Sequence, residues 1–139
     1  MATSQRKIRE IVFQIIYSRS FSKSSNEGLL SLVVKKLKVS KKSARLALEK
    51  ALTIEKCFPE IDEKMAAYLD TYKVEQLSTV EKNVLRLGLF ELFYDEAIPK
   101  EVAIAEAIRL CRKFGSIEGA KFVNAILDGS YKHHQKQAS

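Results

Sequence analysis

The first helix-forming segment carries arginines and large aromatic residues on one face, a combination suited to binding nucleic acid. At about 100° per residue, Arg6, Arg9, Phe13 and Tyr17 project nearly opposite an isoleucine-rich stripe, and Lys7 borders that stripe. Arginine neutralises phosphate and stacks on bases, while tyrosine and phenylalanine rings offer stacking platforms. The alternative is that a second helix covers Phe13 and Tyr17, which would then belong to the core. This pattern alone leaves both interpretations open.

The residue types that carry catalysis are poorly placed for it. Both histidines, His133 and His134, lie in the polar C-terminal segment, and Cys57 and Cys111 have no cysteine or histidine close in sequence. The chain contains no GxGxxG, Walker A or HExxH motif. The carboxylates are spread over what should be solvated helix faces. We therefore expect no catalytic residues, no cofactor and no metal site, and a protein that is not an enzyme.

The charge is unevenly distributed along the 139 residues. Lys and Arg number 24 against 17 Asp and Glu, a net charge of +7. Residues 1–45 carry a net +9, residues 46–108 a net −6 and residues 109–139 a net +4. Basic ends predict a surface for a polyanion, provided that the fold brings the two ends together. The acidic middle would repel nucleic acid and predicts a dock for a basic protein. Ordinary solvated helix faces of uneven charge are the alternative.

Apolar residues recur at the spacing of amphipathic helices along nearly the whole chain. Five glycines and two prolines are too few for an all-β fold. We predict an all-α protein of about seven helices, with one domain over residues 1–131 and a polar flexible tail at 132–139. The predicted helices cover residues 4–18, 27–37, 40–57, 59–72, 78–93, 99–114 and 118–128.

Local signals mark several helix ends. Ser78 and Glu81 have the spacing of a capping box, in which each side chain accepts a hydrogen bond from the other residue's backbone N–H. Gly88 interrupts the strongly apolar helix that follows, which predicts the close approach of another helix there. Gly115 suits a left-handed C-terminal cap. That apolar helix should be central, because its large side chains encircle most of it.

Cysteine usage and hydropathy indicate a cytoplasmic protein. Two distant cysteines do not form a disulfide framework. No apolar run approaches the ~18–20 residues of a membrane span, and the N-terminus lacks the apolar core of a secretory signal. We expect no membrane partner.

Three stretches resemble the NusB family of bacterial transcription antitermination factors. They cover residues 9–18, 80–92 and 99–127. The last is the most specific, with Lys113-Phe114-Gly115 and Lys121-Phe122-Val123-Asn124 within it. The likeness extends over about the first twenty residues and most of 57–131, whereas residues 20–56 match only in helical character.

The resemblance implies an all-helical fold of two small packed bundles. It also implies a function: binding of the boxA element of ribosomal RNA operon transcripts together with NusE, a small-subunit ribosomal protein. The resulting assembly is expected to let RNA polymerase read through terminators. In this family an arginine-rich N-terminal segment contacts RNA, which here corresponds to Arg6, Lys7 and Arg9, with Tyr17 further along.

Further candidate contacts follow from the resemblance and the charge map. Phe122 lies in the matching Lys-Phe-Val-Asn stretch and is a second candidate RNA contact, or else an ordinary core residue. The acidic residues Glu75, Glu81 and Glu91 are candidates for docking NusE. Glu81 ranks low, because its carboxylate is also required by the capping box.

Two other functions remain compatible with the sequence: a helical protein–protein adaptor, and an accessory RNA-binding module of an RNA-modification system. Binding of a boxA RNA separates the antitermination factor from an adaptor. The oligomeric state is also open, since a homodimer could bury the RNA face of the first helix.

Overall fold

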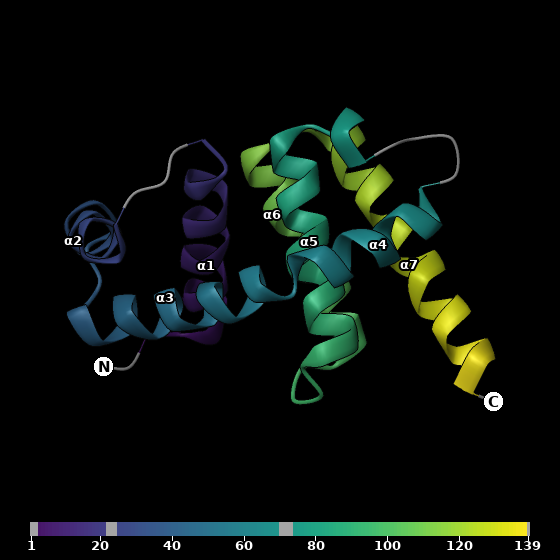
Figure 1. Ribbon diagram of the computed structural model, residues 1–139, viewed down its shortest axis with the longest axis horizontal. Helices are drawn as coiled ribbons and strands as arrows, with labels where there is room; N and C mark the ends of the chain where they lie inside the picture. The colour runs from purple at the N-terminus through teal and green to yellow at the C-terminus, as the bar shows by residue number, and fades with distance from the viewer. Residues whose placement is uncertain (1–2, 22–24, 70–73, 139) are drawn as a thin grey trace. The chain divides into compact units, whose positions relative to one another are not determined.

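The computed structural model describes residues 3–21, 25–69 and 74–138, and every regular element within these ranges is helical (Figure 1). This confirms the predicted all-α class. The chain divides into two compact units, Met1–Lys56 and Cys57–Ser139. None of the described helices is both long enough and apolar enough to cross a bilayer.

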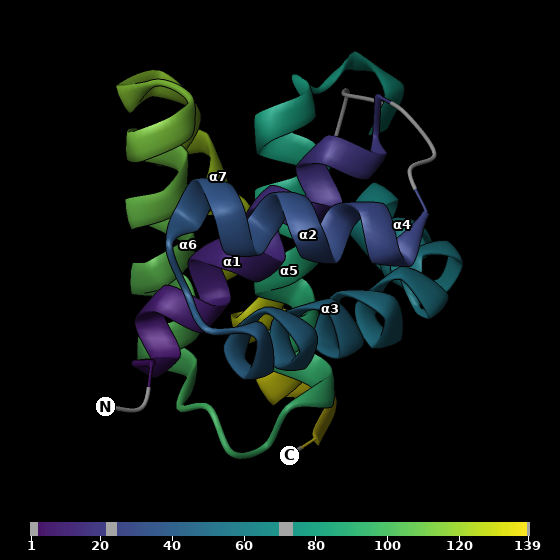
Figure 2. The ribbon, with the colours of Figure 1, turned by 90° about the vertical axis from the view of Figure 1, so that its left-hand side faces the viewer.

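The described part of the first unit consists of α1 (Gln5–Arg19), α2 (Asn26–Leu37) and α3 (Lys41–Lys56) (Figure 2). α1 packs along α3, and α2 contacts both. The apolar stripe of α1 meets a face of α3 that is rich in alanine, and small side chains allow two helices to lie close together. The buried residues of this contact region include Ile11, Ile15, Ala44, Ala47 and Ala51.

Serine side chains cap the beginnings of these helices. Ser4 Oγ accepts a hydrogen bond from Lys7 N at 3.1 Å, and Ser40 Oγ accepts one from Ser43 N at 3.0 Å. Each bond satisfies a backbone donor that has no partner within its helix. Between α2 and α3 the chain reverses at Lys38, whose φ of 53° lies in the left-handed region that glycine normally occupies.

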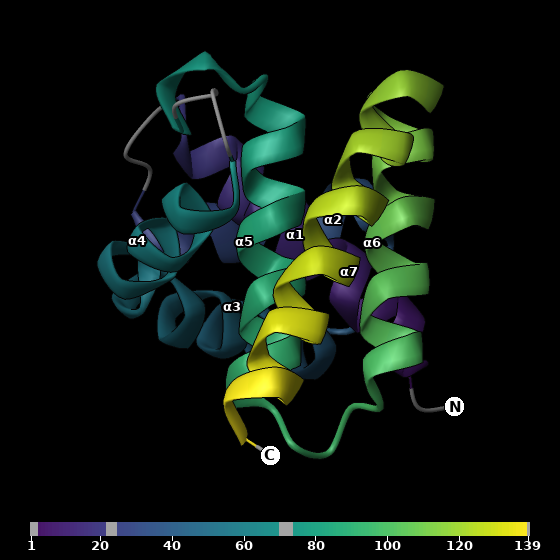
Figure 3. The ribbon, with the colours of Figure 1, turned by 90° about the vertical axis from the view of Figure 1, so that its right-hand side faces the viewer.

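The described part of the second unit contains α4 (Phe58–Tyr68), the 3₁₀ turn η1 (Val74–Gln76), α5 (Thr79–Tyr94), α6 (Lys100–Phe114) and α7 (Ile117–Ala138). α5 contacts α4, α6 and α7, which confirms that the most apolar helix is central (Figure 3). The predicted helix over 59–72 ends at Tyr68, and residues 70–73 lie outside the described residues.

Two local predictions for α5 are confirmed. Ser78 N donates to Glu81 Oε1 at 3.3 Å and Glu81 N donates to Ser78 Oγ at 3.1 Å, which completes the capping box. A Cβ at Gly88 would lie 2.9 Å from Leu127 Cδ1 of α7 and 3.5 Å from Ala107 Cβ of α6. Glycine at this position therefore lets α7 approach α5.

Gly115 ends α6 as predicted, but its conformation is not the one that we expected. Its φ is −126°, so the backbone is not left-handed. A Cβ there would lie 2.9 Å from the Cys111 carbonyl oxygen and 3.0 Å from Val80 Cγ1. Crowding, rather than backbone conformation, favours glycine.

α7 also differs from the prediction, because it continues to Ala138 instead of ending near Asp128. The segment expected to be a flexible tail is helical as far as Ala138. Lys132 Nζ lies 3.0 Å from Asp128 Oδ2 across the expected end. The rings of His133 and His134 contact Tyr68 and Phe93, at centroid distances of 5.6 and 5.0 Å. Such contacts with distant residues stabilise a helical end that the local sequence does not favour.

Candidate nucleic-acid interface

The N-terminal turn of α1 presents the first group of predicted RNA contacts. Ser4 caps the helix, and its first turn contains no acidic residue. Arg6 is exposed and Lys7 is half-buried in this turn. Two cations at a helix N-terminus add to the positive end of the helix dipole. This turn therefore provides a cationic surface that suits phosphate.

Further along α1, the predicted polar face turns inward. Arg9 is 5% exposed and Phe13 is 1% exposed. The burial of Phe13 favours the second interpretation that the sequence left open, in which its ring serves in packing. Arg6 is exposed and Lys7 is half-buried, so these two cations are better placed than Arg9 to reach a ligand.

Aromatic rings follow one another along the C-terminal half of α1 and into the turn that follows it. Tyr17, which is half-buried, stacks on Phe13 at a centroid distance of 5.9 Å and meets the Phe21 ring edge-to-face at 5.0 Å. Phe21 is 66% exposed. It was not among the predicted contacts, although it continues the four-residue spacing of Phe13 and Tyr17. These rings thus run from the core to the surface, and the outer two can offer a face to a base.

Arg19, near the end of the same helix, is engaged within the first unit. Its Nε donates to Glu55 Oε2 at 2.9 Å and its Nη1 to Asn26 Oδ1 at 3.2 Å. This arginine ties α1 to the end of α3, and we assign it no ligand.

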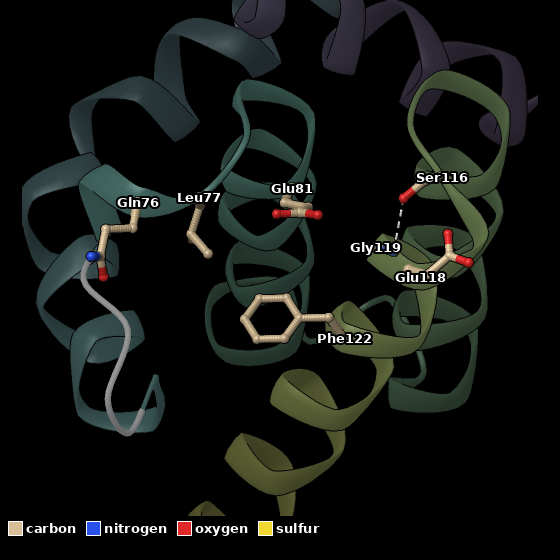
Figure 4. A pocket seen from close by; sticks show the side chains of 7 residues that line it. All are labelled: Gln76, Leu77, Glu81, Ser116, Glu118, Gly119 and Phe122. Atoms are coloured by element: carbon tan, nitrogen blue, oxygen red, sulfur yellow. Dashed lines mark hydrogen bonds between the residues drawn. The ribbon is translucent and has the colours of Figure 1, made fainter.

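The second unit contains a cavity of about 270 Å³ between η1, the start of α5 and the start of α7 (Figure 4). Phe122 reaches from α7 toward the side that carries Glu81 and Leu77. Glu81 and Phe122, which we predicted as contacts for two different partners, therefore line the same cavity. Its full lining is Gln76, Leu77, Glu81, Ser116, Glu118, Gly119 and Phe122.

Glu81 is held by its capping box, with Oε1 accepting from Ser78 N. A Cβ on Gly119 would lie only 2.9 Å from Glu81 Oε2, so glycine at this position lets α7 lie close to the carboxylate. Ser116 caps α7 by accepting from Gly119 N at 2.9 Å. With Glu118, the lining holds two carboxylates, which would accept hydrogen bonds from a cationic side chain or from base amino groups and would repel phosphate.

The three predicted docking carboxylates occupy different environments. Glu75 is exposed in η1, directly before Gln76 of the cavity, and Glu81 is half-buried in the lining. Glu91 is 2% exposed, so its carboxylate lies away from the surface that a docked protein would touch. The sequence pointed to none of Gln76, Leu77, Ser116 and Glu118. Gln76 and Leu77 lie just before α5 in the chain, whereas only the packing of α7 against α5 brings Ser116 and Glu118 to Glu81.

Cys111 lies next to Gly119 of the cavity lining and does not have the properties of a catalytic nucleophile. Its Sγ would lie 3.2 Å from a Cβ on Gly119, and its side chain is buried. Burial raises the pKa of the Cys111 thiol, and the Glu81 charge acts in the same direction. The thiol therefore stays protonated and unreactive near neutral pH. No cluster of three or more metal-binding side chains is found within residues 3–21, 25–69 and 74–138.

Comparison with known proteins places both units in one family. The NusB family model matches residues 6–132. The transcription antitermination protein NusB of Chlamydia pneumoniae is 40% identical over 124 residues, which cover 89% of this chain and 78% of that protein. The solved NusB structure of T. maritima is 32% identical with a TM-score of 0.83, covering 95% of this chain and 93% of that one.

A further solved structure, of the antitermination factors NusB and NusE in complex with dsRNA, contains a chain that is 25% identical to this one. Its TM-score is 0.80, and the match covers 93% of this chain and 96% of that chain. Taken together with the family match over residues 6–132, these likenesses show that the chain belongs to the NusB family.

Proposed function

We propose that this chain is an RNA-binding transcription antitermination factor. It binds the boxA element of ribosomal RNA operon transcripts together with NusE, and the assembly lets RNA polymerase read through terminators in the cytoplasm. The observation that carries this proposal is the NusB family match over residues 6–132, which includes both the cationic start of α1 and the cavity of the second unit. A relative with NusE and dsRNA in one solved complex supports the choice of partners.

In this proposal the first unit supplies the RNA affinity. Arg6 and Lys7 neutralise phosphates, and the half-exposed ring of Tyr17 stacks on a base. Arg9 and Phe13 are buried and hold the helix that carries these groups. Single-stranded RNA suits this arrangement, because its unstacked bases can reach an aromatic ring.

The cavity of the second unit provides two further contacts. Phe122 is half-buried at its rim and offers a ring face for a base. Glu81, with the exposed Glu75 next to the lining, forms the acidic side that receives a cationic side chain of NusE. Carboxylates fit a basic ribosomal protein better than they fit a phosphate backbone. That the two basic chain ends share one RNA surface stays a prediction.

A binding titration tests the function directly. Fluorescence anisotropy of labelled boxA RNA is compared with that of an RNA of the same composition in scrambled order, each with and without NusE. We expect tighter binding of boxA than of the scrambled RNA, and a further gain when NusE is present. Equal affinity for the two RNAs, with and without NusE, would contradict the proposal.

A further inference from the structure

A run of cationic residues, here called the α2–α3 basic surface, covers the end of α2 and the start of α3. Between Gly28 and Leu48 the sequence has six Lys and Arg residues and no Asp or Glu. All six side chains are exposed, and none forms an ion pair with another described residue. These residues are Lys35, Lys36, Lys38, Lys41, Lys42 and Arg45.

The α2–α3 basic surface adjoins the start of α1. Thr3 Oγ1 and Ser43 Oγ are 2.6 Å apart, and α1 packs along α3. The first turn of α1, with Arg6 and Lys7, therefore lies beside the first turn of α3 (Figures 1 and 2). The lysines of α3 extend the cationic surface of the proposed RNA interface within one unit.

The folding of α3 does not account for its lysines. The N-terminal turn of a helix carries partial positive charge and disfavours cations. Lys41 and Lys42 nevertheless occupy that turn, which contains no acidic residue. Lys35 and Lys36 differ, because they lie in the last turn of α2, where cations complement the dipole. Lys41 and Lys42 thus add to a positive potential that a bound polyanion would neutralise.

We propose that the α2–α3 basic surface binds the phosphate backbone of RNA that flanks the boxA element, without reading its bases. This inference rests on the proposed function. Lysine is a compact charge on a long flexible stem, which suits phosphate contacts that do not depend on sequence. Residues 28–48 contain no aromatic side chain on which a base could stack. Continuity with Arg6 and Lys7 favours RNA over an acidic protein segment as the ligand.

The test uses the full chain with Lys41→Gln and Lys42→Gln combined. Glutamine keeps a good helix-forming propensity, and removal of cations from a helix N-terminus relieves repulsion. The matched control combines Lys56→Gln with Lys64→Gln, two exposed lysines outside the surface, so both proteins lose the same charge. Labelled boxA RNA is titrated without a flank, with a 5′ oligouridine flank and with a 3′ oligouridine flank, over a range of salt concentrations.

For the native protein and the control, we expect at least one flank to tighten binding. For the Lys41/Lys42 variant, the gain from the flank should be largely lost, while binding of unflanked boxA RNA stays within about twofold of native. The salt slope is the slope of the logarithm of the binding constant against the logarithm of the salt concentration. The loss of two contacts with phosphates of single-stranded RNA lowers its magnitude by about 1.4, which corresponds to roughly 25-fold weaker binding of the flanked RNA at about 0.1 M salt. The melting temperature of the variant should not fall.

Several outcomes would overturn the inference. One is a flank that adds nothing to native binding, and another is a variant that behaves like the control. A variant that loses affinity equally for all RNAs would assign the lysines to the boxA site itself. Binding of a polyglutamate peptide that depends on these lysines, without any flank effect, would assign the surface to an acidic protein. If native protein binds no boxA RNA, the proposed function itself fails, and that result is distinct from the others.

Discussion

Replacement of Gly88 by alanine should destabilise the second unit, although alanine is the better helix former. The intrinsic preference of a helix interior for alanine over glycine is about 1 kcal/mol. Against it, the new Cβ would lie 2.9 Å from Leu127 Cδ1 and 3.2 Å from Leu127 Cδ2. Leu127 is fully buried and has little room to move, and such overpacking costs about 1–3 kcal/mol. We expect a net loss of about 1 kcal/mol.

When the Leu127 side chain is truncated, Gly88→Ala should stabilise the protein instead of destabilising it. Leu127→Ala alone should cost about 2–5 kcal/mol, because it leaves a cavity between α5 and α7. In that background the Cβ of Gly88→Ala meets Ala107 Cβ at 3.5 Å, an ordinary contact, and fills part of the cavity. The substitution should then stabilise by about 1 kcal/mol. The coupling between the two sites is therefore about 2 kcal/mol.

This double-mutant cycle compares the native protein, Gly88→Ala, Leu127→Ala and the double variant. Urea unfolding followed by circular dichroism measures the free energy of unfolding of each. Gly129→Ala in α7 is the matched control, because nothing lies within 4 Å of the place that its new methyl group would take, and it should stabilise by about 1 kcal/mol. Our account of the close contact is refuted if Gly88→Ala stabilises the native background, or if its effect is the same in both backgrounds. The contact also bears on the proposed function, because it limits how closely α7, with Phe122, approaches α5, with Glu81.

Three further predictions concern the proposed RNA site and the pH dependence of stability. Arg6→Ala with Lys7→Ala should lower the salt slope of boxA binding by about 1.4, and an unchanged slope would remove both from the site. Tyr17→Ala should weaken boxA binding by about 1–3 kcal/mol, whereas a fall in melting temperature with unchanged affinity would make Tyr17 a packing residue. Burial and the Glu60 carboxylate raise the pKa of Tyr94 from 10.0 to about 12. Its contribution to stability is therefore complete below about pH 10 and is lost as the pH rises toward about 12. The free energy of unfolding of Tyr94→Phe, measured against pH in the alkaline range, should lack this loss. A variant with the native pH dependence would contradict the assignment of the loss to Tyr94.

Features that depend on neighbouring residues could be predicted from the sequence. The capping box of Ser78 and Glu81 formed as expected, because its partners are only three residues apart. The helical spacing of apolar residues predicted the all-α class and a central helix at α5. Gly88 indicated a close helix contact, since a glycine there costs stability unless something needs the space.

Features that depend on distant residues could not be predicted in this way. A helical projection places Phe13 and Arg9 on one face but does not show that this face is buried. The helix over residues 129–138 depends partly on ring contacts of His133 and His134 with residues on α4 and α5. The crowding at Gly115 comes partly from Val80, which belongs to another helix.

The sequence by itself determined the helical class, the start of α5 at its capping box, the charge of each segment and the likeness to one family. Only the tertiary structure decided which charged and aromatic side chains reach the surface, and that Glu81 and Phe122 line one cavity. The physical reason is that capping and periodicity act over a few residues. Burial and the shape of a site, in contrast, arise when helices far apart in the chain pack together and exclude water.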